Sequence, residues 1–155
     1  MKKSVLILLS LVPVVVGWVV NILIMVPVIG MGGFYLLPLL TTVFWFFLGK
    51  RYARKWKAVP AVLIARTVGI CSLLIYLWQF LLETDVTRSM TLAGFSQMFS
   101  ASTPLYLIGR IAVLFESQPN YAGRASMVAL QVIGLVYMII VFSVGMYLEK
   151  KRTKE

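Results

Sequence analysis

The sequence predicts an all-α integral membrane protein with four transmembrane helices and both termini on the cytoplasmic side. Hydrophobic residues make up 61% of the 155 positions and charged residues only 13%, whereas a soluble domain is about half apolar and about a quarter charged. The apolar residues gather in four stretches, at about 4–27, 31–49, 59–82 and 125–148. Basic residues cluster at alternate ends of these stretches, which is the pattern of the positive-inside rule.

The first stretch, Ser4 to Pro27, follows two lysines at positions 2 and 3. A helix of about 24 residues is roughly 36 Å long, which is enough for a hydrocarbon core of about 30 Å. A secretory signal peptide also starts with basic residues, but its apolar core is shorter and a cleavage site of small residues follows. We therefore favour a retained helix, and Pro13 is expected to kink it because proline removes a backbone hydrogen bond.

A tight connection is predicted at 27–33, because this segment contains a proline and three glycines, which break helices. The second span follows at about 31–49, and its aromatic run at 44–47 suits a belt at the membrane surface. The segment 49–57 then holds five basic residues and no acid, which is the strongest orientation signal in the chain. These residues are expected to attract anionic lipid headgroups; they are Lys50, Arg51, Arg54, Lys55 and Lys57.

Small residues in the third and fourth spans, at about 59–82 and 125–148, predict close helix packing. Three of them are spaced by four positions in the third span and so share one face of a helix, where another helix can approach closely. The candidate packing residues are Ala61, Ala65, Gly69, Ala125 and Ala129, with further small contacts at Gly134 and Gly145. Cys71, the single cysteine, lies within the same apolar run and is expected to be an inert, buried thiol.

The segment 83–124 is more polar and is predicted to lie on the extracytoplasmic side. Thr103 and Pro104 are a typical helix start, so a short helix is expected at about 104–116. It is too short to span and would lie in the interface or re-enter the protein. A five-span alternative would thread 92–115 through the bilayer, but it would place the basic C-terminal tail outside.

Counting the basic residues decides the predicted topology. With four spans and an internal N-terminus, eleven lysines and arginines face the cytoplasm and three arginines face outward, which the positive-inside rule favours strongly. The inner set is Lys2, Lys3, Lys50, Arg51, Arg54, Lys55, Lys57, Lys150, Lys151, Arg152 and Lys154. The outer set is Arg88, Arg110 and Arg124.

Five polar residues are candidates for ligand binding: Arg66, Arg110, Asn21, Gln79 and Gln131. A charge at the centre of a membrane helix costs at least about 2.5 kcal/mol, so Arg66 would bind an anion or a partner's acid if it is buried. The simpler interpretation, which we prefer, is that the helix begins near Val62 or that Arg66 extends to the headgroups. Arg110 is expected to pair with Glu83, Asp85 or Glu116, or else to hold an anion. The amides are expected to form interhelical hydrogen bonds or to line a cavity.

The composition also limits the classes of function. The chain has no histidine and one cysteine, so no catalytic group, metal site or cofactor is expected. The net charge of +10 is explained by the ends of the spans rather than by nucleic-acid binding. The leading hypothesis is a non-enzymatic, multi-pass subunit or accessory protein of a bacterial cytoplasmic-membrane complex. Its partners would be anionic lipid and another membrane protein or a second copy. The alternatives are a small transporter, channel or substrate-capturing component with an anion-favouring site near Arg66, and thirdly a lipid-modifying enzyme.

Overall fold

The computed structural model describes residues 2–23, 27–101 and 123–153, with side chains at 2–19, 36–96, 123 and 125–153. Every regular element within these ranges is a helix, which confirms the all-α prediction for this part of the chain. The helices are α1 (Lys3–Leu9), α2 (Val12–Leu23), α3 (Pro27–Ala53), α4 (Ala58–Leu77), the π-helical turn η1 (Trp78–Leu82), α5 (Met90–Ala101) and α7 (Arg124–Arg152).

Among the described residues, two helices are long and apolar enough to cross a membrane. The first is α4 continued by η1, which together cover Ala58–Leu82, and the second is Ala125–Arg152 of α7. They coincide with the predicted spans at 59–82 and 125–148. Twenty-five residues of helix are about 37 Å long, so either helix exceeds the hydrocarbon core of a typical bilayer.

The predicted first span is divided into two helices. α1 ends at Leu9 and α2 begins at Val12, one residue before Pro13. Proline has no backbone N–H and crowds the preceding turn, and the chain around it tightens, with Leu11 N–H donating to the Leu8 carbonyl at 3.0 Å. The expected effect of Pro13 is therefore confirmed, but it is a break rather than a bend within one helix.

α3 begins earlier and ends later than predicted. It runs from Pro27 to Ala53, so the expected tight connection at 27–33 is wrong. Proline is favoured at the first position of a helix, where its missing N–H has no partner to lose, and the glycines that follow remain helical. At the other end the helix includes Lys50 and Arg51, so only 54–57 form the turn to α4.

Glycines bring α3 and α7 into backbone contact. A Cβ atom added to Gly49 would lie 2.2 Å from the Phe142 carbonyl oxygen, and one added to Gly145 would lie 2.2 Å from the Phe46 carbonyl oxygen. The contact is reciprocal, since each glycine of one helix faces a carbonyl of the other. Cα–H groups pointing at carbonyl oxygens are a recurring feature of such close helix pairs.

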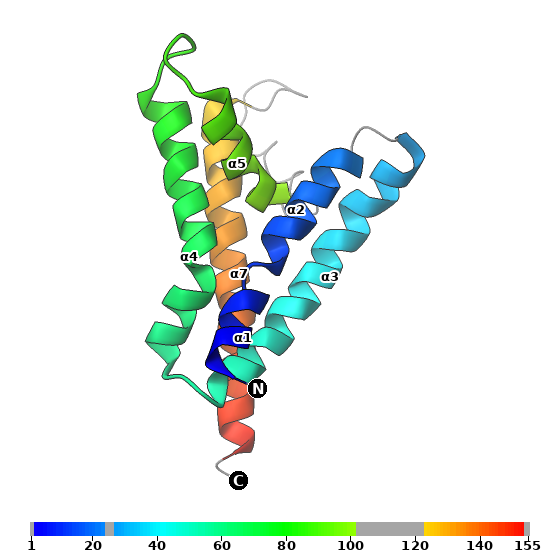
Figure 1. Ribbon diagram of the computed structural model, residues 1–155, viewed down its shortest axis with the longest axis vertical. Coiled ribbons are helices and arrows are strands. Elements are labelled where there is room, and N and C mark those ends of the chain that lie inside the picture. Colours follow the sequence, from blue (N-terminus) through cyan, green and yellow to red (C-terminus); the bar gives the residue numbers. More distant parts are fainter. Residues whose placement is uncertain (1, 24–26, 102–122, 154–155) are drawn as a thin grey trace.

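The hydrophobic core lies where α1, α3, α4 and α7 converge. Its buried residues are Leu6, Trp45, Leu48, Tyr52, Ala61, Ala65, Met138, Phe142 and Met146. Away from this core α2 and α3 diverge from α4 and α7, and α5 runs back into the space between them, alongside α2 and α4 (Figure 1). The sequence did not predict a helix at 90–101, since the re-entry that it suggested was for a helix at 104–116. The expected helix at 104–116 falls outside the described residues.

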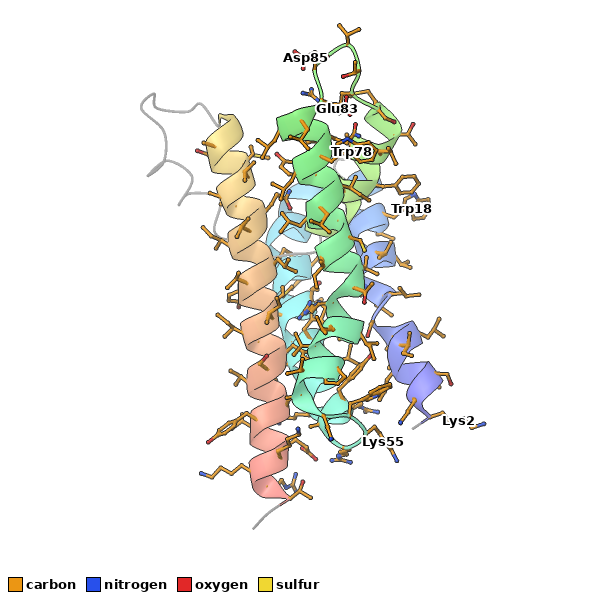
Figure 2. All side chains as sticks on the ribbon, turned by 90° about the vertical axis from the view of Figure 1, so that its left-hand side faces the viewer. Lys2, Trp18, Lys55, Trp78, Glu83 and Asp85 are labelled. Atoms are coloured by element: carbon orange, nitrogen blue, oxygen red, sulfur yellow. The ribbon has the colours of Figure 1, made fainter. Side chains whose placement is uncertain are left out.

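Basic residues gather at one end of the molecule. Lys2 and Lys55 lie at the end near the C-terminus, whereas Glu83 and Asp85 lie at the opposite end (Figure 2). Contacts join the start of α1, the turn after α3 and the end of α7 at this end. Lys3 Nζ lies 4.6 Å from the Trp56 ring centre, and Arg54 pairs with Glu149. Ten of the eleven lysines and arginines predicted to face the cytoplasm are described, and their segments share this end. We call it the basic end.

Candidate functional site

Among the residues whose side chains are described, Arg66 is the most deeply buried charged residue. α4 starts at Ala58 and continues past it, and Arg66 is 0% exposed. Both parts of the preferred interpretation are therefore wrong: the helix does not begin near Val62, and Arg66 does not extend to the surface. Its position nine residues after Lys57 places it about 13 Å along the helix axis. On this face of α4, Ala65 and Gly69 are also buried, so the side chain is directed into the core.

Aromatic rings from two other helices enclose the guanidinium group of Arg66. Its Cζ lies 3.6 Å from the centre of the Trp45 ring and 5.6 Å from that of Phe142. The two rings meet edge to face, with their centres 6.2 Å apart. Stacking of a planar guanidinium on a ring face is a cation–π interaction, worth about 2 kcal/mol when it is removed from water.

The polar atoms of Arg66 are only partly satisfied. Nη2 donates a hydrogen bond to the Met138 carbonyl oxygen of α7. Nε and Nη1 are buried without a hydrogen-bond partner among the described residues, as is the Nε1 atom of Trp45. A buried donor without a partner costs about 1–3 kcal/mol, and more when it is charged. The site therefore has spare donor capacity for an acceptor, such as a water molecule or an anion.

The described carboxylates are too far from Arg66 to neutralise it. Glu149 lies eleven residues beyond Met138 on α7, about 16 Å along the helix, and Glu83 lies seventeen residues beyond Arg66, about 25 Å along α4 and η1. Each also has another partner: Glu149 binds Arg54, and Glu83 accepts from Trp78 Nε1 at 2.9 Å. Within the described residues, the guanidinium is thus a buried cation held by rings and one carbonyl group.

The basic end has a more ordinary polar structure. Arg54 Nη2 lies 2.6 Å from Glu149 Oε1, and Arg54 Nε donates to the same oxygen at 2.7 Å. The hydroxyl groups of Ser10 and Tyr52 are 2.8 Å apart. Tyr52 lies beyond the predicted span at 31–49, and burial raises the pKa of its phenol, an effect that the hydrogen bond with Ser10 opposes. Its hydroxyl group therefore stays protonated and joins α1 to the end of α3.

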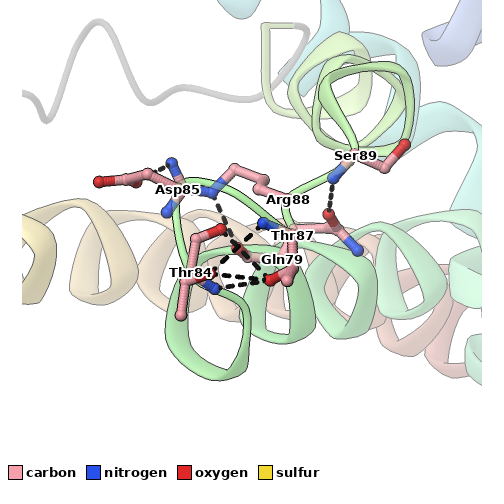
Figure 3. Close-up of polar contacts among 6 residues, drawn as sticks. All are labelled: Gln79, Thr84, Asp85, Thr87, Arg88 and Ser89. Atoms are coloured by element: carbon pink, nitrogen blue, oxygen red, sulfur yellow. Dashed lines mark hydrogen bonds and ion pairs between the residues drawn. The ribbon is translucent and has the colours of Figure 1, made fainter.

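Gln79 belongs to a separate network at the opposite end (Figure 3). Its Oε1 accepts from the Ser89 N–H at 2.8 Å, and its backbone oxygen accepts from Arg88 Nε at 3.0 Å. Arg88 also pairs with Asp85 at 2.8 Å. The network closes the turn between η1 and α5. Gln79 lies thirteen residues beyond Arg66, about 20 Å away along the helix, so these two predicted site residues do not share a site.

The other predicted residues are distributed as follows. Gln131 is half-buried on α7, Asn21 lies on α2 where side chains are not described, and Arg110 is outside the described residues. Two carboxylates proposed as partners of Arg110 have contacts within the described residues, Glu83 with Trp78 and Asp85 with Arg88.

Four of the five predicted packing residues are at least half-buried: Ala61, Ala65, Gly69 and Ala129, whereas Ala125 is exposed. Ala61 and Ala65 belong to the core shared with α3 and α7, so these two small residues of α4 pack against helices of the same chain. Cys71 is exposed on the outward side of α4, and the expectation of a buried thiol is wrong. A residue's apolar neighbours in sequence do not show which face of a helix it occupies.

Sequence reasoning missed the residues that enclose Arg66. Trp45 was assigned to a surface belt, yet it is 1% exposed. The helical period offered a signal, because Trp45, Leu48, Gly49 and Tyr52 fall on one face at intervals of three and four. The period does not reveal that Phe142, almost a hundred residues away, completes the same cluster. No group of three or more metal-binding side chains occurs among the described residues.

Compared with protein-family models, with characterised proteins and with solved structures, the chain shows no significant match.

Proposed function

We propose that this chain is a small, non-enzymatic subunit or accessory protein of a bacterial cytoplasmic-membrane assembly, acting through helix packing. It would have four transmembrane helices with the basic end in the cytoplasm. The lengths of α4 with η1 and of α7 support two of these crossings. The 27 residues of α3, closely paired with α7, support a third, and α1 with α2 would supply the fourth. The basic segments at one end support the orientation.

The observation that carries the packing function is the outward face of α4. A row of residues at intervals of three and four is exposed along α4 and continues to the first residue of η1: Val59, Leu63, Thr67, Cys71, Leu74 and Trp78. Thr67 turns its hydroxyl group back to the Leu63 carbonyl, at 2.8 Å, so the face presents no free hydroxyl donor there. Two small residues, Thr67 and Cys71, stand between larger ones, and small residues let a neighbouring helix approach closely in a membrane.

Crosslinking in native membranes tests this function. A photoreactive residue at Thr67 should give a covalent adduct of defined mass, because the outward face of α4 meets a protein. The matched control is a photoreactive residue at Val136, which is exposed on α7 and should meet lipid. Monomers alone at position 67, or the same products at both positions, would refute the proposal. Oxidation of Cys71 in the unmodified chain then identifies a second copy as the partner if a disulfide-linked dimer forms.

A second candidate function rests on the two unpartnered donors of Arg66. A buried guanidinium with spare N–H groups is suited to an anion or carboxylate, so the chain would capture or transport an anionic solute. Gln79 does not take part, because it is bound in the outer turn. Anion flux into proteoliposomes that is lost in Arg66→Met but kept in Arg88→Met would favour this function. Equal flux in both variants would exclude it.

A further inference from the structure

A cavity of about 430 Å³ opens at the basic end between α1, α3 and α7. Its cationic lining residues are Lys50, Arg51, Arg54, Lys55 and Arg152, and among the described residues the one carboxylate that lines it is that of Glu149. We call this cavity the basic pocket. Lys57, which the sequence grouped with the others, does not line it, whereas Arg152 from α7 does. The charges are therefore gathered around one concave site rather than spread evenly over a loop.

The carboxylate does not cancel the charge of the basic pocket. Glu149 is 8% exposed and is bound twice by Arg54, at 2.6 and 2.7 Å. One cation is thus paired within the protein, and the lining also contains Lys50, Lys55 and Arg152, so its described side chains carry more positive than negative charge. Lysine and arginine side chains around such a site are suited to a phosphate group, through charge-assisted hydrogen bonds.

The apolar part of the lining indicates the source of that phosphate. Phe47 lines the pocket, is 54% exposed and belongs to the outer side of α3, and Leu6 of α1 also lines it. Lys50 Nζ lies 4.6 and 5.4 Å from the ring centres of Phe46 and Phe47. Its ammonium group is thereby held where the basic end meets the apolar surface. A phosphate there would have a hydrocarbon surface beside it, as a lipid requires and a free anion does not.

We propose that the basic pocket is a binding site for the headgroup phosphate of an anionic phospholipid, with an acyl chain along Phe47. Basic pockets between helices at the cytoplasmic side are a known means of recognising such headgroups. The inference rests on the proposed membrane insertion but not on any partner protein. It would therefore hold even if crosslinking at Thr67 found none.

Binding to the full chain can be measured by native mass spectrometry after adding phosphatidylglycerol or phosphatidylcholine in detergent. Phosphatidylglycerol should stay bound and phosphatidylcholine should not. The variant Lys50→Gln/Lys55→Gln should bind phosphatidylglycerol at least about tenfold more weakly, since each cation near an anionic surface contributes about 1 kcal/mol. The matched control, Lys57→Gln/Lys151→Gln, removes two exposed lysines at the same end, outside the pocket, and should change binding less than about twofold.

Three results would overturn the site. Equal losses in the two double variants would show a diffuse charge effect, equal retention of both lipids would show no headgroup recognition, and displacement by equimolar inorganic phosphate would show a free-anion site. If Lys50→Gln/Lys55→Gln lowers the thermal unfolding temperature, its loss of binding could come from unfolding, and binding is then measured with Lys50→Arg/Lys55→Arg. That variant keeps both charges and should retain phosphatidylglycerol, and its failure to do so would likewise refute the proposal.

Discussion

Near the basic end α4 buries Arg66, and near the opposite end η1 buries Gln79, but the two side chains differ in how far their polar atoms are hydrogen-bonded. Gln79 is 2% exposed, and its side-chain oxygen and its backbone oxygen each accept a hydrogen bond from the following turn. Arg66 is 0% exposed, and two of its nitrogens have no hydrogen-bond partner among the described residues. A polar group that only serves the fold is normally satisfied by its neighbours. We therefore assign Gln79 to the structure of the turn and Arg66 to the second candidate function.

The two ends also differ in how their helices are joined. At the basic end the backbones of α3 and α7 touch at Gly49 and Gly145, and aromatic rings fill the space around them. At the other end α5 is joined to α4 through polar atoms, with Ser72 Oγ donating to the Ser96 carbonyl at 2.7 Å. The basic end thus adds close backbone packing to its polar contacts, whereas α5 is joined to α4 through polar atoms, so substitutions at the two ends should have different effects.

The largest effect is expected where the backbones touch. Gly49→Ala should lower the free energy of unfolding in detergent by about 3 kcal/mol, because the added Cβ would overlap the Phe142 carbonyl and force the helices apart. Gly94→Ala is the matched control on α5, where an added Cβ meets no atom within 4 Å. It should be neutral, or more stable by up to about 1 kcal/mol from helix propensity. Equal losses in both variants would contradict the close α3–α7 contact.

Replacing the buried cation should raise the free energy of unfolding rather than lower it. Arg66→Met removes an uncompensated charge at similar volume, so we expect the free energy of unfolding to rise by about 1–2 kcal/mol, despite the lost contact with Trp45. Arg66→Lys keeps the charge without the planar stack and should lower that free energy by about 1–2 kcal/mol. A loss of more than about 2 kcal/mol in Arg66→Met, measured by denaturant titration, would make Arg66 a structural residue.

At the opposite end, removing a satisfied polar group should destabilise the fold. Gln79→Met leaves the Ser89 N–H without its acceptor, and we expect a loss of about 1–2 kcal/mol in the same titration. Hydrogen exchange at Ser89 should also become faster. Leu82→Met, at a position that is 80% exposed, is the control and should change neither quantity. An unchanged stability in Gln79→Met would mean that the turn does not depend on this hydrogen bond.

The smallest effect is expected at the hydrogen bond between α1 and α3. Tyr52→Phe removes the hydroxyl group that lies 2.8 Å from Ser10 but keeps the ring against Phe142, so a loss of about 1 kcal/mol is expected. Tyr147→Phe is the matched control, because Tyr147 is 67% exposed. Equal thermal unfolding temperatures for the two variants would show that the hydrogen bond contributes nothing.

Much of the helical pattern could be predicted from the sequence, because membrane spans depend on local apolar length. The stretches at 59–82 and 125–148 gave helices close to their predicted bounds, and Pro13 was recognised as a disruption. The glycines at 30, 32 and 33 were misjudged, since breaking a helix is only a tendency of glycine and the helix continued through them. The helix at 90–101 was missed because its polar residues hid the weak apolar pattern.

The surroundings of Arg66 were harder to predict, because they depend on contacts between distant parts of the chain. The sequence singled out Arg66 and the small residues beside it, but it could not show that Trp45 and Phe142 meet there. Gly49 was counted only as the first residue of the basic segment 49–57, and its packing role could not be predicted because it depends on a partner, Gly145, that lies ninety-six residues away. Contacts of this kind arise from the crossing of helices and leave no local signature.

The proposed membrane protein requires the two ends of α4 to lie on opposite sides of a membrane. Single cysteines at Lys57 and at Val86, which is 94% exposed in the turn between η1 and α5, bracket Ala58–Leu82 in a Cys71→Ser background. An impermeant maleimide added to intact cells should label position 86, and should label position 57 only after the cells are permeabilised. Labelling of both positions from the same side, or of position 57 alone in intact cells, would contradict the account.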